Sequence, residues 1–200
     1  MPIMAAVPVK SFWAAKQRLA TAVAPEGRIA LSQEMARRTC TLVAEAGAAP
    51  LVLAADVEVA KWAQSLALEV ILDGCSDLNH AAREAVAIAS GRPWLLIHAD
   101  LPLLDLEVLS ILMAGVDRGG SVIAASRDGG TPALGASLTE FDFSYGPSSF
   151  KRHLRRLAPH DPTVVIDPRL AIDLDDPSDV EIVRRRVPWM TTILDTLDPS

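Results

Sequence analysis

The sequence is poor in aromatic residues, in cysteine and in positive charge, and each shortage narrows the classes of protein it can encode. Aromatic residues make up 4% of the 200 residues, so alanine, leucine and valine must fill most of the core. The two cysteines, Cys40 and Cys75, form no CxxC pair, which fits a reducing cytosol. The formal net charge of −6 argues against general nucleic-acid binding, because such domains are usually basic. An anionic small substrate remains compatible, since a site needs only local positive charge.

Long hydrophobic runs and several catalytic motifs are also missing. No apolar run approaches the ~20 residues of a membrane-spanning helix. The first residues, MPIMAAVPVK, have no basic region ahead of a long apolar core, so no signal peptide is expected. No GxGxxG or GxxxxGK[ST] follows the first strand, and HExxH, GxSxG and a PCxxC partner for a zinc deaminase are absent. We therefore expect a cytoplasmic protein that binds neither membranes nor nucleic acid and is not a Rossmann, P-loop or zinc-protease enzyme.

Apolar runs of strand length alternate with helical segments over nearly all of the first 126 residues. This order predicts a three-layer α/β fold with a mostly parallel sheet. The glycine-rich middle third is expected to cover the carboxyl edge and to add an antiparallel strand. One domain over 1–187 is expected, then a tail, 188–200, broken by Pro188. Strands are predicted at 3–9, 50–55, 69–72, 93–99, 121–126, 133–137 and 163–166, an extended segment at 171–175 and a turn at 73–77. Helices are predicted at 28–46, 57–67, 78–89, 105–116, from the opening segment 145–150 to about 157, and from 177.

The most informative stretch is PWLLIHADLPLL, residues 93–104. Its apolar start is typical of a strand buried on both faces of a parallel sheet, and the strand must stop near Asp100 because Pro102 cannot continue it. Ligands of open α/β sheets bind at the carboxyl ends of strands, so Asp100 is a candidate metal ligand. A helix cap or a loop acid is the alternative.

A second acidic segment, AIDLDDP, carries Asp173 and Asp175 two residues apart. If the segment is extended, the two side chains share a face, and together with Asp100 they could hold Mg²⁺, which prefers oxygen ligands. The competing interpretation is a helix N-terminus with Asp176 or Asp175 as cap and Pro177 in the first turn. Both can be true at once.

The loop after the first strand is cationic and lies at the same predicted edge. Lys10, Lys16 and Arg18 could bind a polyphosphate, although Lys16 and Arg18 could instead be solvated helix-surface charges. The remaining candidates for nucleotide binding are Val9 at the end of the first strand, Asp56 after the second, and Asn79, which could touch a nucleobase or a sugar or merely cap a helix.

The third constellation spans residues 127–153. The loop 128–131 can bring backbone amides against a ligand, and the helix predicted after GPSSF would present free N–H groups to an anion. Lys151, Arg152 and His153 are expected to add positive charge. The alternative is a serine-capped helix with proline near its first position and an exposed basic face.

These motifs, in this order, resemble the guanylyltransferases of coenzyme F420 biosynthesis over about residues 3–185. The resemblance implies a nucleotidyltransferase fold of the glycosyltransferase-A type, Mg²⁺ at the Asp100 loop, and transfer of GMP from GTP to 2-phospho-L-lactate, phosphoenolpyruvate or 3-phospho-D-glycerate. The segments that carry it are VPVKSFWAAKQRLA, LNHAA, HADLPLL, RDGGTPAL, YGPSSFKRHL and AIDLDDPSD.

By position, Thr131, Gly146 and Ser149 match family residues that hold the phospho-acid, with Gly130 and Ser148 beside them. Lys10, Lys16 and Arg18 match the loop on the triphosphate side. The family often reads DGGTNAL and FGPGSF, and here Pro132 and Ser148 depart from it on the acceptor side, which leaves the acid open.

The resemblance also suggests a downstream transferase that consumes an unstable product, and a homodimer is possible. A nucleotide-sugar glycosyltransferase, which would release a nucleoside diphosphate, and a non-catalytic nucleotide-binding module are the other functions considered.

Overall fold

The computed structural model describes residues 1–72 and 77–197, without the side chains at 118, 196 and 197. Most of the turn predicted at 73–77, including Cys75, lies outside the described residues. In the part of the chain that is described, no helix has the length and apolar character needed to cross a membrane.

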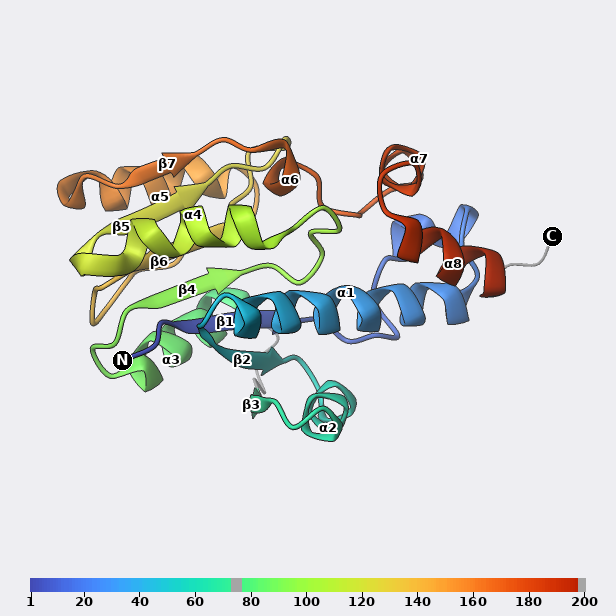
Figure 1. Ribbon diagram of the computed structural model, residues 1–200, viewed down its shortest axis with the longest axis horizontal. Helices are drawn as coiled ribbons and strands as arrows, with labels where there is room; N and C mark the ends of the chain where they lie inside the picture. Colours follow the sequence, from blue (N-terminus) through green and yellow to red (C-terminus); the bar gives the residue numbers. More distant parts are fainter. Residues whose placement is uncertain (73–76, 198–200) are drawn as a thin grey trace.

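A single seven-stranded sheet organises the chain, in the order β3-β2-β1-β4-β6-β5-β7 (Figure 1). All neighbouring strands are parallel except β6, which is antiparallel to both β4 and β5. The predicted α/β class, the mostly parallel sheet and the antiparallel strand in the middle third are thereby confirmed. The strands are β1 Met4–Val9, β2 Ala49–Ala54, β3 Glu69–Leu72, β4 Trp94–Ile97, β5 Ser121–Ala124, β6 Ala133–Ala136 and β7 Thr163–Val165.

Helices cover both faces of the sheet, which makes the predicted three layers. Alternate residues of β4 point to opposite faces, and all are buried: Leu95 and Ile97 join the core on one side, Trp94 and Leu96 the core on the other. The first face is covered by α1 Pro25–Glu45, α2 Val57–Ser65 and α4 Leu106–Val116, and the second by α3 Leu78–Ala89 and α5 Ser149–Leu157.

The two central strands separate toward their carboxyl ends. β1 pairs with β4 only from Met4 to Ala6, whereas its pairing with β2 continues to Val9. Pro8 lies in the unpaired half of this contact, where it has no N–H to donate. The strand predicted at 3–9 ends where β1 ends, at Val9, and the separation leaves room between the loops after β1 and β4.

A third core cluster lies beyond the end of the sheet, where α1 extends toward α7 Pro177–Arg184 and α8 Pro188–Leu197 (Figure 1). It joins the short 3-10 helix η1 Gln17–Thr21 to these two helices through the buried Leu19, Leu174 and Met190. The ring of Trp189 lies 4.8 Å from the Arg38 guanidinium of α1. The C-terminal segment therefore packs on its own domain.

Two expectations for the C-terminal third are wrong. Pro188 does not break the tail but begins α8, because a proline at the first helical position loses no hydrogen bond. Ala171 is not extended: it ends the short helix α6 Pro168–Ala171, which Asp167 caps by accepting from the Arg169 N–H. Ile172, the next residue, is extended as expected, and residues 172–175 form no ladder in the described sheet.

Candidate functional site

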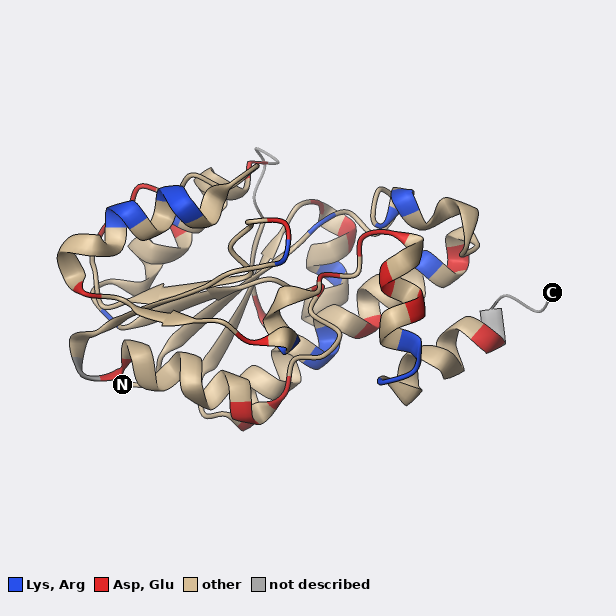
Figure 2. Ribbon diagram, turned by 90° about the horizontal axis from the view of Figure 1, so that it is seen from above, with Lys and Arg blue, Asp and Glu red and all other residues tan. Residues whose placement is uncertain are grey.

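A cavity of about 470 Å³ opens at the carboxyl edge of the sheet, over the gap between β1 and β4. The strands run from β1 outward to β3 and then return to β4 on the other side of β1, so this gap is the switch point where α/β sheets bind ligands. Figure 2 shows charged residues on loops and helix surfaces around a sheet whose centre carries none. The lining includes Val9, Lys10, Lys16, His98, Asp100 and Asp175.

The Lys16 ammonium is the electrostatic centre of this cavity. Its Nζ lies 2.8 Å from Asp100 Oδ2 and 3.1 Å from Asp175 Oδ1, and its side chain is only 8% exposed. Burial alone would lower the pKa of Lys16, but the two carboxylates outweigh it and raise that pKa. Burial would likewise raise the pKa of Asp100, but Lys16 and His98 hold it well below its ordinary value. The alternative of a solvated surface lysine is therefore excluded for Lys16.

Local backbone geometry brings these three residues together. Lys16 adopts a left-handed conformation (φ 55°) ahead of η1, a strained state for a residue with a Cβ. The Leu174 N–H donates to the Asp100 carbonyl at 3.1 Å, which ties the acidic segment directly to the end of β4. Asp176 caps α7 in a capping box with Asp179, so the predicted helix start and the predicted acid cluster are both present.

Asp173 completes the acidic cluster without an ion-pair partner of its own among the described residues. Burial and the nearby charges of Asp100 and Asp175 raise its pKa to about 6. Three carboxylates suit a hard cation such as Mg²⁺ in chemistry and charge. In the free protein, however, Lys16 Nζ lies between two of them, and the described residues contain no ready-made group of three ligands. A cation would thus have to displace the Lys16 ammonium.

The residues predicted to hold the acceptor are neutral groups. Thr131 Oγ1 lies 3.0 Å from Ser149 Oγ and 3.0 Å from His153 Nδ1, and all three residues are buried. The backbone N–H of His98 donates to the Pro132 carbonyl, so Thr131 is held next to the end of β4. The structure therefore brings Thr131 and Ser149 into contact near the end of β4, although neither lines the cavity. That they hold the phospho-acid stays a prediction.

The loops around this hydroxyl pair are tight turns. Gly129 (φ 81°) closes the 126–130 turn, and its carbonyl accepts from the Phe150 N–H. The Gly130 N–H donates to Asp128, and Gly146 (φ 112°) makes the bend before α5. Ser148 does not cap the helix with its side chain, which corrects the serine-capped interpretation. Its φ of 56° explains why glycine suits this position in the family pattern.

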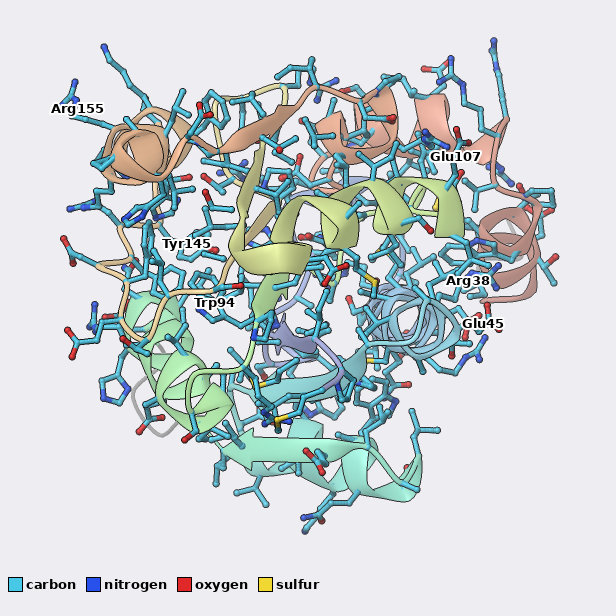
Figure 3. The ribbon with its side chains drawn as sticks, turned by 60° about the vertical axis from the view of Figure 1, so that its left-hand side comes forward. Arg38, Glu45, Trp94, Glu107, Tyr145 and Arg155 are labelled. Atoms are coloured by element: carbon cyan, nitrogen blue, oxygen red, sulfur yellow. The ribbon has the colours of Figure 1, made fainter. Side chains whose placement is uncertain are left out.

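Other candidate residues occupy different places. Lys10 is exposed at the cavity mouth, whereas Arg18 is exposed on η1 and outside the cavity lining. Asp56 caps α2 by accepting from the Val59 N–H at 2.8 Å. Asn79 Oδ1 accepts from the Tyr145 N–H at 2.5 Å, which links α3 to the segment before α5 (Figure 3). Their roles in nucleotide binding stay predictions.

Two histidines of the site differ from what their local sequence indicates: His153 in its charge and His98 in its place. His153 adds no positive charge: burial and the charges of Arg156 and Arg152 lower its pKa to about 4. The spacing of Ser149, His153 and Leu157, four residues apart, is the signal that could have placed this ring on the buried face of α5. His98 lines the cavity, and its Nδ1 lies 4.0 Å from Asp100 Oδ1.

Comparison with solved structures defines the class of fold. A putative nucleotide-diphospho-sugar transferase from Desulfovibrio desulfuricans G20 superposes with a TM-score of 0.78 at 15% identity, covering 93% of this chain and 88% of that one. A nucleotidyl transferase from Methanothermobacter gives a TM-score of 0.68 at 16% identity, covering 92% and 97%. At this identity the likeness establishes the nucleotidyltransferase-type fold alone.

Sequence relatives narrow the class. Residues 3–184 match the family described as "Guanylyl transferase CofC like". The chain is 33% identical over 189 residues to the phosphoenolpyruvate guanylyltransferase of Roseiflexus sp. (strain RS-1), covering 90% of this chain and 84% of that protein. It is 29% identical over 157 residues to the 2-phospho-L-lactate guanylyltransferase of Methanothermobacter thermautotrophicus, covering 77% and 70%. The chain belongs to this guanylyltransferase family of coenzyme F420 biosynthesis, as the motifs predicted.

Proposed function

We propose that this protein transfers GMP from GTP to the phosphate of a small phospho-carboxylic acid and releases pyrophosphate. The observation that carries the proposal is that the acidic residues Asp100, Asp173 and Asp175, with Lys16 between two of them, lie at the same edge of the sheet as the hydroxyl pair Thr131 and Ser149. The names of the relatives favour phosphoenolpyruvate or 2-phospho-L-lactate as the acceptor. 3-Phospho-D-glycerate remains a third candidate from the sequence resemblance.

The reaction needs two anions to meet. An oxygen of the acceptor phosphate attacks the α-phosphorus of GTP and forms a new P–O bond. The bond from that phosphorus to the bridging oxygen breaks, and pyrophosphate leaves with the oxygen and its electron pair. The attacking phosphate is already anionic near neutral pH, so no general base is required. Catalysis is then positioning and charge neutralisation.

This chain's own charges suit that task. Lys16 and Lys10, both on the loop after β1, would stabilise negative charge on the triphosphate and on the departing pyrophosphate. Asp100, Asp173 and Asp175 would hold Mg²⁺, which when bound supplies positive charge to the phosphates. Thr131, Ser149 and the turns at Gly130 and Gly146 would orient the acid with hydroxyl and backbone groups.

The deciding experiment supplies GTP and Mg²⁺ with each of the three acids in turn and measures pyrophosphate. We expect release with one acid, and none with pyruvate, which lacks the attacking phosphate. A parallel assay with a GDP-sugar in place of GTP tests the glycosyltransferase alternative: release of GDP there, with no pyrophosphate from GTP, would support it. GTP binding without turnover on any acid would support a non-catalytic module.

A further inference from the structure

A buried ring beneath the acceptor side has a fixed hydrogen-bonding direction. The backbone N–H of Ser144 donates to His153 Nε2 at 2.8 Å, so Nε2 must be the unprotonated nitrogen. The ring is neutral, because burial and the neighbouring Arg156 and Arg152 oppose a positive charge there. A neutral imidazole carries one hydrogen, which must therefore be on Nδ1.

The Nδ1 hydrogen points at the hydroxyl pair. Nδ1 lies 3.0 Å from Thr131 Oγ1, so this contact is a donation from the ring to the threonine oxygen. The second contact, Thr131 Oγ1 to Ser149 Oγ at 3.0 Å, uses one hydroxyl hydrogen, whichever residue donates it. Two hydroxyls carry two hydrogens, so one remains for a further acceptor.

The opposite tautomer would reverse this outcome. With Nδ1 unprotonated, the ring would accept a hydroxyl hydrogen, the Thr131–Ser149 contact would use the other, and none would remain. The pair would then present only lone pairs to a ligand. A lone pair facing a phosphate or carboxylate oxygen repels it, whereas a donated hydrogen binds it.

The contact that fixes the tautomer is itself held from two helices. Arg152 of α5 donates to the Ser144 carbonyl at 2.8 Å, and Asn79 of α3 accepts from the next N–H, that of Tyr145. The Tyr145 ring packs edge-on against the His153 ring, with centroids 4.8 Å apart. The imidazole therefore has little freedom to flip or to reach water.

We propose that His153 is a positioning residue: by donating from Nδ1, it keeps one hydroxyl hydrogen of the Thr131–Ser149 pair free for an oxygen of the anionic acceptor. This inference rests on the proposed function for the identity of the acceptor. The direction of the hydrogen bond from His153 to Thr131 does not depend on that function. The ring touches no reacting atom and acts only through the hydroxyl pair.

The tautomer can be read directly in the free protein. Long-range ¹H–¹⁵N NMR of histidine-labelled protein at neutral pH distinguishes the two ring nitrogens. We expect His153 to carry its proton on Nδ1 and none on Nε2. The signals of His153 are assigned as the set that is absent from the spectrum of His153→Asn. A proton on Nε2, or a charged ring, would overturn the proposal whatever the enzyme's substrate.

Two substitutions then separate the two ring nitrogens. The amide of His153→Asn can place an N–H donor where Nδ1 was, whereas His153→Gln reaches the Nε2 position and retains only the contact with Ser144. We expect His153→Gln to raise KM for the acid about tenfold to a hundredfold, the range of one hydrogen bond to a charged group, and to leave KM for GTP unchanged. For His153→Asn, KM for the acid and KM for GTP should both stay within about threefold of the wild-type values, since asparagine keeps the donation to Thr131 Oγ1.

The pattern separates positioning from mere packing. Equal losses in both variants, or parallel rises in KM for the acid and for GTP, would contradict the proposal. Circular dichroism melts confirm that both variants fold, and the NMR result decides the tautomer if a variant does not. If the wild type releases no pyrophosphate with any acid, the proposed function fails, while the tautomer measurement still stands.

Discussion

The candidate site has two sides, of which only the charged one lines the cavity, and the two are stabilised in opposite ways. On the side of β1 and β4, charges face charges: the Lys16 ammonium is held between Asp100 and Asp175. On the side of β6 and α5, neutral groups meet: two hydroxyls and a neutral imidazole form a buried chain of hydrogen bonds. The charged side must exchange its internal partners for a ligand's charges, whereas the neutral side already has its donor in place.

Because of this difference, a substitution is expected to have a different effect on each side of the site. A buried ion pair is worth little net stability, because desolvation offsets the attraction, but removing one partner leaves an uncompensated charge. A buried hydroxyl chain contributes about 1 kcal/mol per bond and fixes geometry. We therefore expect substitutions on the charged side to change turnover most, and those on the neutral side to change acceptor affinity and acid stability.

The largest effect is expected for Asp100→Asn. Asparagine keeps the shape but removes the negative charge that faces Lys16 and would face Mg²⁺, so kcat should fall by about a thousandfold or more. The fold should persist, because the Leu174 N–H bonds to the backbone carbonyl of residue 100 and not to the side chain. Pyrophosphate release and circular dichroism measure the two quantities.

Asp105→Asn is the matched control for that substitution. Asp105 follows the same loop, caps α4 through the Val108 N–H and pairs with Arg169. Asparagine also caps helices well, so a rate near that of the wild type is expected. A near-normal rate for Asp100→Asn would refute the metal assignment.

The next effect is a loss of stability in acid that originates on the neutral side. The pKa of His153 is about 4 in the folded protein, below the ordinary value of 6.5, so the unfolded state binds a proton that the folded state does not. This contribution to the free energy of unfolding is complete above pH 6.5 and lost as the pH falls to about 4, by about 3 kcal/mol.

Urea unfolding of the wild type and of His153→Asn across this pH range isolates the contribution of His153 to the free energy of unfolding, because asparagine does not titrate. The difference in unfolding free energy between the two proteins should narrow as the pH falls. A constant difference would mean that the folded ring takes up its proton near its ordinary pKa.

Thr131→Val tests the hydroxyl chain at its centre. Removing this hydroxyl leaves the His153 Nδ1–H without its acceptor and breaks the contact with Ser149, so KM for the acid should rise about tenfold. KM for GTP should not change. Thr163→Val, the same substitution on the exposed strand β7, should alter neither constant. A shift of both constants by Thr131→Val would indicate that the two sides are not independent.

The smallest effect returns to the charged side. The pKa of Asp173 is raised to about 6, so at neutral pH its charge destabilises the folded state, and Asp173→Asn should raise the free energy of unfolding by about 1 kcal/mol after allowance for solvent screening. Thermal melts without divalent cations measure this gain. Asp142→Asn, at an exposed ion pair with Arg156, should show no gain. Added Mg²⁺ should stabilise the wild type and not Asp173→Asn.

Much of the scaffold could be predicted because its signals are local. The strand Glu69–Leu72 and the helix Leu78–Ala89 have the predicted boundaries, since turn residues separate them. Asp100 could be placed because an apolar run ended at an acid followed by Leu-Pro. The helix α8, which was not predicted, begins at a proline in the same way as α1 and α7. Pro188 is therefore itself a local signal of a helix start, because proline is favoured at the first helical position.

The interior of the site could not be predicted because its signals are long-range. Lys16 and Asp175 are 159 residues apart in the chain, and no local pattern states which carboxylate a loop lysine will bind. His153 sits in the run KRH, which suggests a basic surface. Only the burial of one face of α5 shows that its ring is neutral while Lys151 remains exposed.

The third core cluster sets the order in which this protein can become active during synthesis. It joins Leu19 and Leu31, made early, to Leu174, Val183 and Met190, made last, and the residues it positions include Lys16 and Asp175. A nascent chain that has emerged only as far as β7 can already pair every strand of the sheet, yet it lacks the second carboxylate partner of Lys16. Catalytic competence therefore arrives with the final helices, so a ribosome-bound fragment would hold a formed scaffold without a finished site.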